Sequence, residues 1–228
     1  MFSNPHSKPE AIKHNPLNRF LYDFSYPFAK FFASLGCTPN HLTWLSNFSA
    51  VISAIALAWK APAWVFIISW LSSVVLDFSD GTVARMIGKR SKNAFRFDHM
   101  SDLAKISIVL ISAGLYHNTK YTWLLCSAAL FSFMYYSILN HELKAANSSI
   151  NSALLVENPN TFLNELKANK ILLTAYTTLG CINGHTLLIL LALPFGPTPV
   201  SIALVYLILV SLFGSALRIR RLMSLPKP

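Results

Sequence analysis

Residues 76–102 of this chain read LDFSDGTVARMIGKRSKNAFRFDHMSD, and apolar stretches at residues 61–76 and 103–115 lie on either side. Four of the chain's nine acidic residues fall within this segment: Asp77, Asp80, Asp98 and Asp102. A carboxylate beside hydrocarbon is costly unless a positive group neutralises it. The segment therefore predicts two membrane helices that carry a cation-binding site at their joined ends.

The composition is that of a membrane protein. Of the 228 residues, 54% are hydrophobic and 12% are charged, and the mean hydropathy is +0.46. A transmembrane helix needs about 20 mainly apolar residues, and a helix satisfies its own backbone polar groups. We expect an all-α integral membrane protein with six transmembrane helices, at residues 41–59, 63–86, 98–117, 121–141, 170–194 and 199–217.

The N-terminal region has a different character. Residues 1–15 are expected to be a cytoplasmic lead, since they lack the apolar core of a cleavable signal peptide. Residues 16–35 mix aromatic and charged side chains, which predicts either an interfacial helix along the membrane plane or an amphipathic helix packed on the bundle. The chain thus divides into residues 1–36, a six-helix domain at 37–222 and a cytoplasmic tail at 223–228.

The net charge of +10 is unevenly distributed. If the N-terminus is placed inside, 16 of the 19 Lys and Arg residues fall on the inner side of the membrane. Lys60 and Lys120 fall on the outer side, and Lys105 lies within the third helix. This bias predicts that both termini, the Asp segment and the 142–169 loop are cytoplasmic. That loop is either a plain connector or a cover for an active site. The basic residues are expected to meet anionic lipid headgroups rather than nucleic acid.

The spacing of the carboxylates predicts how they are arranged. Asp77 and Asp80 are three residues apart and Asp98 and Asp102 are four apart, so each pair shares one helix face. Antiparallel helices joined by a short basic loop would bring all four into one cleft near the inner membrane surface. Hard divalent cations would relieve their repulsion. Two such ions can steady the attacking and leaving oxygens of a phosphoryl displacement.

The residues that follow the first pair fit a phosphate ligand. Gly81 and Ala84 are small and lie on or beside the Asp face, which leaves room for a ligand or for close helix packing. Arg85 supplies a forked cation suited to phosphate. Helix capping explains Asp98 well. It does not explain the first pair, which follows an apolar run at a helix C-terminal end, where the dipole disfavours anions.

The segment closely resembles the signature of the CDP-alcohol phosphotransferase (CDP-alcohol phosphatidyltransferase) family, D-x2-D-G-x2-A-R-x8-G-x3-D-x3-D. It matches every fixed position except the second glycine, which is Ala94 here. The resemblance covers most of residues 37–220. It implies transfer of a substituted phosphate from a CDP-alcohol to an acceptor hydroxyl, with release of CMP. It also implies two Mg²⁺ or Mn²⁺ ions and, by analogy, a homodimer.

The family's functional residues map onto matching positions of this chain. Its metal ligands correspond to Asp77, Asp80, Asp98 and Asp102, and its proposed general base corresponds to Asp102. Its CDP-alcohol contacts correspond to the motif and to the turn before the first transmembrane helix: Asn40, Thr43, Gly81, Ala84, Arg85 and Ser91. If the family's glycine is needed so that the backbone can approach the nucleotide closely, the methyl group of Ala94 crowds the nucleotide. If the position needs only to be small, alanine serves, and with four carboxylates intact we expect an active enzyme.

Other polar and sulfur-containing residues have simpler interpretations. Lys105 either binds a phosphate or carboxylate of a substrate or pairs with an Asp. The widely spaced cysteines contain no CxxC pair and are expected to be small packing residues: Cys37, Cys126 and Cys181. A basic group near the C-terminus is expected mainly to anchor the topology, with binding of the acceptor as the alternative: Arg218, Arg220 and Arg221.

We therefore predict a membrane enzyme of phospholipid synthesis in which Asp102 takes a proton from the attacking hydroxyl. The expected donor is CDP-diacylglycerol and the expected acceptor a small polar alcohol. The string Phe97-Asp98-His99 resembles the choline and ethanolamine phosphotransferases, and keeps open CDP-ethanolamine or CDP-choline as donor with diacylglycerol as acceptor. A carboxylate-based ion transporter would favour ionisable groups near the membrane midplane. An inactive scaffold is the last alternative, for which Ala94 is the only hint.

Overall fold

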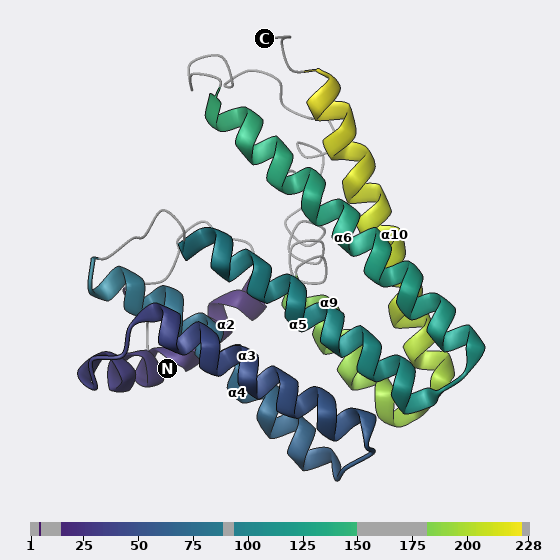
Figure 1. The fold of residues 1–228 in the computed structure, drawn as a ribbon, viewed down its shortest axis with the longest axis horizontal. Coiled ribbons are helices and arrows are strands. Elements are labelled where there is room, and N and C mark those ends of the chain that lie inside the picture. The colour runs from purple at the N-terminus through teal and green to yellow at the C-terminus, as the bar shows by residue number, and fades with distance from the viewer. Residues whose placement is uncertain (1–4, 6–14, 89–93, 150–181, 225–228) are drawn as a thin grey trace.

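The computed structural model describes residues 5, 15–88, 94–149 and 182–224, and every regular element in these residues is helical. The elements, in chain order, are α2 (Pro16–Ser34), α3 (Pro39–Ala58), α4 (Ala63–Met86), α5 (Ala94–His117), α6 (Lys120–Ser149), α9 (Ile182–Ala192), the 3₁₀ turn η2 (Leu193–Phe195) and α10 (Pro197–Met223). The prediction of an all-α fold is confirmed for this part of the chain (Figure 1).

Four helices are long and apolar enough to cross a membrane: Pro39–Ala58, Trp64–Met86, Lys120–Leu143 and Pro197–Met223. They correspond to the predicted first, second, fourth and sixth spans. α5 covers the predicted third span but is not among the four, and its sequence carries charges at Asp102 and Lys105. The predicted fifth span, 170–194, lies partly outside the described residues, and what is described is a shorter apolar helix. Six spans therefore remain a prediction.

Two helices extend beyond the predicted spans. α6 continues to Ser149, into the segment 142–169 that the sequence predicts as a loop. Its last turns contain Leu, Lys and Ala, which are strong helix formers. α10 likewise continues to Met223, past the predicted end at residue 217, and its last turn carries Arg220 and Arg221. Basic residues in a last turn complement the helix dipole.

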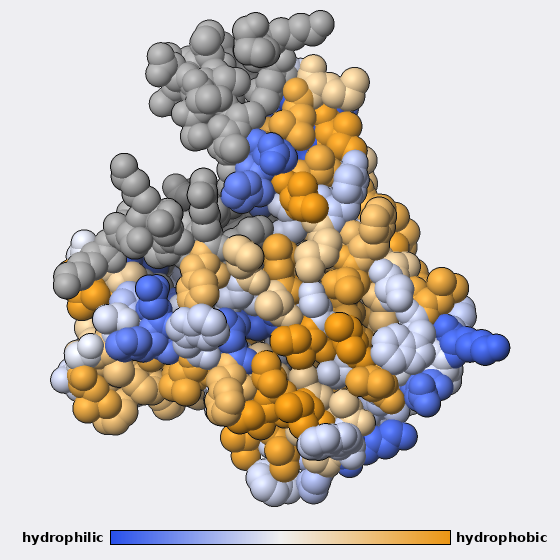
Figure 2. Space-filling model, in the orientation of Figure 1, coloured by the Kyte–Doolittle hydropathy of each residue, from blue (hydrophilic) through white to orange (hydrophobic). Residues whose placement is uncertain are grey.

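Apolar side chains are exposed along the four apolar helices. Leu71, Leu124, Phe131, Ile202 and Leu209 are each more than half exposed. Figure 2 shows hydrophobic residues over much of one face, with hydrophilic residues in separate groups at its right-hand edge and on its left side. Soluble monomers rarely expose so much contiguous apolar surface. This surface and the four apolar helices together support a membrane protein.

The helices form two packed groups that meet at α5 and α9. α3 packs against α4 and α5, while α6 packs against α10 and α5 (Figure 1). One core cluster joins both groups and includes Trp70, Ile106, Phe133 and Leu204. Cys126 is buried in this cluster, as expected for a packing residue. The core thus fixes α5 between the two groups.

Serine hydroxyls set the register between α3 and α4. Ser46 Oγ donates to the Ser73 carbonyl at 2.8 Å, and Ser53 Oγ donates to the Phe66 carbonyl at 2.9 Å. All of these serines are buried. Small residues let membrane helices approach closely, and their hydroxyls bond across the interface. Continued toward the start of α3, the same antiparallel register brings Thr43 opposite the Asp motif.

α2 is an amphipathic helix packed on α4. Asn15 caps its first turn, and Ser25 and Ala29 are buried. Ser79 of α4 donates its hydroxyl to the Ser25 carbonyl at 3.3 Å. A row of aromatic residues remains exposed along the helix: Phe20, Phe24, Phe28 and Phe31. The structure therefore shows packing on the bundle, and the aromatic row is the surface that an interfacial position would use.

Candidate active site

The start of α3 is held by a reciprocal cap. The Thr38 hydroxyl accepts from the His41 backbone N–H at 3.4 Å, and His41 Nδ1 accepts from the Thr38 N–H at 3.4 Å. Gly36, in the turn before it, has φ +74°, a conformation that glycine adopts without strain. This cap fixes the first turns of α3, and with them the direction of the Thr43 side chain.

Thr43 and Asp80 form a buried contact between α3 and α4. Thr43 Oγ1 donates to Asp80 Oδ2 at 2.6 Å. Thr43 is 4% exposed and Asp80 is 7% exposed. A hydroxyl bonded to an ionised carboxylate in such a place is short and strong. In the structure the Thr43 hydroxyl binds Asp80, and the nucleotide contact that the sequence predicts for Thr43 stays a prediction.

Lys105 joins the two halves of the Asp segment. Its ammonium group pairs with Asp77 on α4 and lies 3.6 Å from Asp102 Oδ1 on its own helix. The lysine side chain is 8% exposed, whereas those of Asp77 and Asp102 are 21% and 30% exposed. Of the two interpretations left open for Lys105, the structure shows pairing with Asp. The two carboxylates are therefore more exposed than the ammonium group that pairs with both.

A small cavity of about 20 Å³ adjoins this ion pair. Its walls include Asp77, Asp102 and Lys105, together with Ser73 of α4 and Thr186 of α9. Trp70, Val74 and Ile106 complete the lining. A volume of this size holds about one water molecule. The cavity therefore marks where the packed interior meets the carboxylates, and it is too small for a nucleotide.

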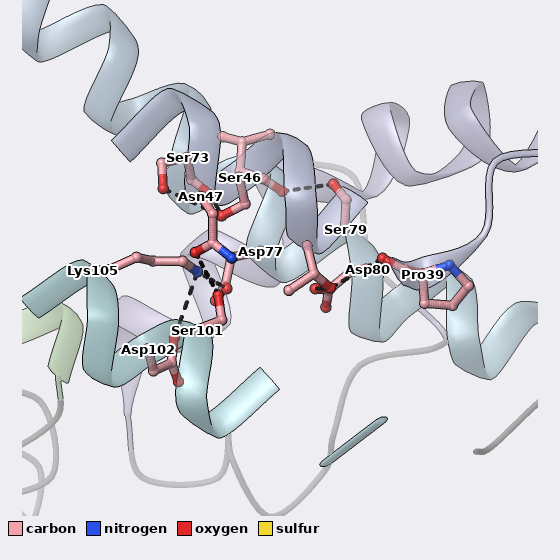
Figure 3. A network of polar contacts seen from close by, with 12 residues as sticks. Pro39, Ser46, Asn47, Ser73, Asp77, Ser79, Asp80, Ser101, Asp102 and Lys105 are labelled. Atoms are coloured by element: carbon pink, nitrogen blue, oxygen red, sulfur yellow. Dashed lines mark hydrogen bonds and ion pairs between the residues drawn. The ribbon is translucent and has the colours of Figure 1, made fainter. Parts of the chain in front are cut away.

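Asn47 and Ser101 connect α3 to the start of α5. Ser101 Oγ donates to Asn47 Oδ1 at 2.7 Å. Asn47 lies four residues after Thr43, so both face the Asp motif from one side of α3. Figure 3 shows this polar network, with Thr43's partner Asp80 on one side and the Lys105 ion pair on the other. α3 thus supports both carboxylate-bearing helices.

Gly81 and Arg85 behave as a pair on the last turns of α4. A Cβ built on Gly81 would lie 3.4 Å from Arg85 Nη1. The guanidinium lies over the Tyr22 ring of α2, with Cζ 5.4 Å from the ring centroid, and Nη2 is 3.4 Å from the Thr82 hydroxyl. Tyr22 also makes an edge contact with the Phe78 ring at 4.8 Å. α2 therefore helps to place the cation that the sequence assigns to phosphate.

The remaining predicted site residues are placed less fully. Asn40 is exposed in the first turn of α3, and Ala84 is half-buried on α4. Asp98 belongs to the first turns of α5, but its side chain is not described. Ser91 lies outside the described residues, as does Cys181. Their predicted roles stay predictions.

The described side chains do not form a metal-binding group of three or more ligands. Within residues 15–88, 94–149 and 182–224, no set of three or more His, Cys, Asp or Glu side chains is arranged to hold an ion. Asp77 and Asp102 nevertheless lie within reach of one ammonium group, and Asp80 is a turn away from Asp77. Carboxylates with neighbouring hydroxyl and amide oxygens are the ligands that Mg²⁺ and Mn²⁺ prefer. The donor set therefore fits the ions that the resemblance implies, with a lysine between two of the donors.

Arg218 has a role that the sequence does not reveal. Its guanidinium donates to Asn140 Oδ1 at 3.2 Å, to the Tyr136 hydroxyl at 2.8 Å and to the Gly214 carbonyl at 3.0 Å. It also lies 4.1 Å from the Tyr136 ring centroid. These contacts connect α10 to α6. Arg218 is therefore a clamp between helices, whereas Arg220 and Arg221 are exposed.

Sequence reasoning missed Asn47, Ser101, Tyr22 and Ser73 as members of the polar network. One signal was available for Asn47, because it repeats the helical spacing from Thr43. Tyr22 gave no such signal, since its contact with Arg85 depends on how α2 folds back on α4. Contacts of that kind follow from tertiary packing alone.

The chain matches the model of one known protein family. A family model described as CDP-alcohol phosphatidyltransferase matches residues 37–213. This match covers more than half of the chain, so the protein belongs to the CDP-alcohol phosphatidyltransferase family. It is a transferase of substituted phosphate groups, in a family that serves phospholipid biosynthesis in membranes. The matched region begins just before α3 and leaves out α2. A comparison with curated proteins gave no match.

Proposed function

We propose that the protein transfers a phosphatidyl group from CDP-diacylglycerol to a small polar alcohol and releases CMP. The observation that carries this proposal is the meeting of Asp77 and Asp102, from different helices, at one cationic group. Carboxylate oxygens that already share one cation are the kind of ligand that a hard divalent ion binds. The family match supplies the reaction class.

Asp102 is the residue we assign as general base. Its side chain is 30% exposed, so an acceptor hydroxyl can reach it from the open side. The hydroxyl oxygen attacks the β-phosphorus, its proton passes to Asp102, and the bond from that phosphorus to the oxygen of CMP breaks. In-line displacement of this kind depends mainly on positioning and on neutralising charge.

The nucleotide side of the site is assigned to α4 and to the start of α3. Arg85 carries a fork that matches two phosphate oxygens, and its guanidinium lies against Gly81, where a Cβ would come within 3.4 Å of Nη1. Divalent ions, Mg²⁺ or Mn²⁺, held by Asp77, Asp80, Asp98 and Asp102, would neutralise the diphosphate and polarise the phosphorus. Asn40, Thr43, Ala84 and Ser91 stay in the proposal as family-based nucleotide contacts.

We also propose that the Asp segment and both termini face the cytoplasm. The charge bias supports this orientation, because Lys60 and Lys120 lie in turns opposite the basic Asp loop. Single cysteines at positions 89 and 120, in a chain without native cysteines, provide the test. An impermeant thiol reagent added to intact cells should label position 120. Labelling of position 89 instead would overturn the orientation.

The reaction itself is tested with purified protein in detergent, Mg²⁺ and two donor sets. The first is CDP-diacylglycerol with a panel of small polar alcohols, and the second is CDP-ethanolamine or CDP-choline with diacylglycerol. Mass spectrometry identifies the lipid formed, and Asp102→Asn is the matched control. A phosphatidyl alcohol formed only by the wild type supports the proposal. A product from the second set alone would replace the donor assignment, and no lipid product from either would contradict the proposed reaction.

A further inference from the structure

Lys105 is buried beside apolar core residues, whereas lysine side chains usually lie in water. Its residue is 7% exposed, and its helix neighbours Ile106 and Val109 belong to the apolar core. An ammonium group is costly in such a place unless carboxylates accompany it. Asp77 and Asp102 meet that need, and both are residues that the proposed function assigns to metal ions. The lysine and the metal therefore share the same ligands.

The carboxylates are more exposed than the lysine that pairs with them. The Asp77 and Asp102 side chains are 21% and 30% exposed, against 8% for Lys105. A divalent ion that approaches Asp77 and Asp102 meets carboxylates whose charge the lysine already offsets. The cavity beside Lys105 is lined in part by Ser73 and Thr186 and has room for about one water molecule.

We propose that Lys105 is a resident cation of the active site, which holds Asp77 and Asp102 together before a metal ion arrives and lowers the affinity of the free enzyme for divalent ions. This inference rests on the proposed function, since it takes both carboxylates as metal ligands. It adds a role for a residue outside the Asp motif. The diphosphate of the donor brings the negative charge that compensates for the lysine, so metal ions bind best together with the nucleotide.

The proposal predicts opposite effects of one substitution on metal affinity and on metal-free stability. In Lys105→Met, the two carboxylates lose their shared cation but keep a side chain of similar length. Mn²⁺ should bind the variant at least about tenfold more tightly than it binds the wild type, because a unit charge close to the ligands no longer repels the ion. In EDTA the variant should unfold at a lower temperature than the wild type, and Mn²⁺ should raise its Tm by more.

The experiment measures Mn²⁺ binding by electron paramagnetic resonance and Tm by thermal unfolding, using full-length protein in detergent. Lys105→Gln is a second neutral variant, Lys105→Arg keeps the charge, and Lys120→Met is a matched control at the exposed start of α6. The two neutral variants should show the tighter binding, while Lys105→Arg and Lys120→Met should resemble the wild type. Unchanged or weaker Mn²⁺ binding in both neutral variants would overturn the role of Lys105.

Measuring Mn²⁺ binding with and without CDP distinguishes a failure of this inference from a failure of the proposed function on which it rests. Wild-type protein should bind Mn²⁺ more tightly with CDP present, and Asp80→Asn should lose that gain. If these two results hold and the Lys105 variants bind like the wild type, only the role of Lys105 is wrong. If neither the wild type nor the variants bind Mn²⁺ with or without CDP, both the metal site and the inference are wrong.

Discussion

Replacing Thr43 with valine tests whether α3 orients the Asp motif. Valine has nearly the same shape as threonine but no hydroxyl. The substitution therefore removes the 2.6 Å bond to Asp80 while it keeps the packing between α3 and α4. Thr43 and Asp80 are both buried, at 4% and 7% exposure, so bulk water does not readily replace the lost donor. Asp80 is then free to turn away from the position in which the structure holds it.

The size of the effect follows from the type of bond. A hydrogen bond to a charged group contributes about 1.5–3 kcal/mol. If that energy serves to orient Asp80 for the nucleotide and metal, its loss lowers kcat/KM by about 10-fold to 150-fold, at 1.4 kcal/mol per factor of ten. Loss of a group that orients a metal ligand typically costs about 10-fold to 100-fold in metal affinity or activity, which agrees with this range.

The assay compares kcat/KM for CMP release by Thr43→Val with two controls. Thr43→Ser keeps the hydroxyl and should stay close to the wild type. Ser53→Ala removes another buried bond between α3 and α4, to the Phe66 carbonyl at 2.9 Å, but lies far along α3 from the carboxylates. It should lower Tm without a comparable loss of activity. Equal activity of Thr43→Val and the wild type would refute the orienting role of Thr43.

Three further substitutions test separate parts of the site. Asp102→Asn should retain binding of the CDP-alcohol but lose at least about 100-fold in kcat, because the general base is gone; normal turnover would remove that role from Asp102. Tyr22→Leu should raise KM for the CDP-alcohol about threefold to tenfold with little change in kcat, because Arg85 loses the ring beneath it, and Tyr22→Phe should behave like the wild type. Ala94→Leu should raise the same KM sharply while Ala94→Gly stays within a few-fold, and normal kinetics of the leucine variant would mean that this position does not face the nucleotide.

Helical periodicity was sufficient to place Asp77 and Asp80 on one helix near its C-terminal end. The structure has both residues in the second half of α4. The pairing of α4 with α3 follows from a short turn, which forces neighbouring helices antiparallel. Features that depend on local spacing and on short connections are therefore readable from the chain.

Contacts between distant segments were not readable in the same way. The family resemblance assigned Thr43 to the nucleotide, and nothing local in the sequence indicates that its hydroxyl also meets Asp80 on the neighbouring helix. Lys105 was left with two interpretations, since its partner Asp77 lies on another helix. The choice between them depends on helix register, which buried serines such as Ser46 determine. Charge neutralisation in the site is thus a property of the packing.

Helix ends were predicted less well than helix centres. α6 runs to Ser149 although hydropathy falls well before that residue, because helix propensity does not need apolar side chains. α5 is a single helix from Ala94 to His117 even though its first half carries charges. Hydropathy finds where a helix can meet lipid, whereas Asp102 and Lys105 of α5 take part in an ion-pair network with Asp77 of α4.

The most direct test of the central claim is CMP release from CDP-diacylglycerol by purified protein, measured with and without an acceptor alcohol and with EDTA in place of Mg²⁺. We predict release that depends on the acceptor, stops in EDTA and returns when Mg²⁺ or Mn²⁺ is restored, while Asp102→Asn stays inactive throughout. Full turnover in metal-free buffer, or release of CMP that Asp102→Asn supports as well as the wild type, would contradict a metal-dependent phosphatidyl transfer at this site.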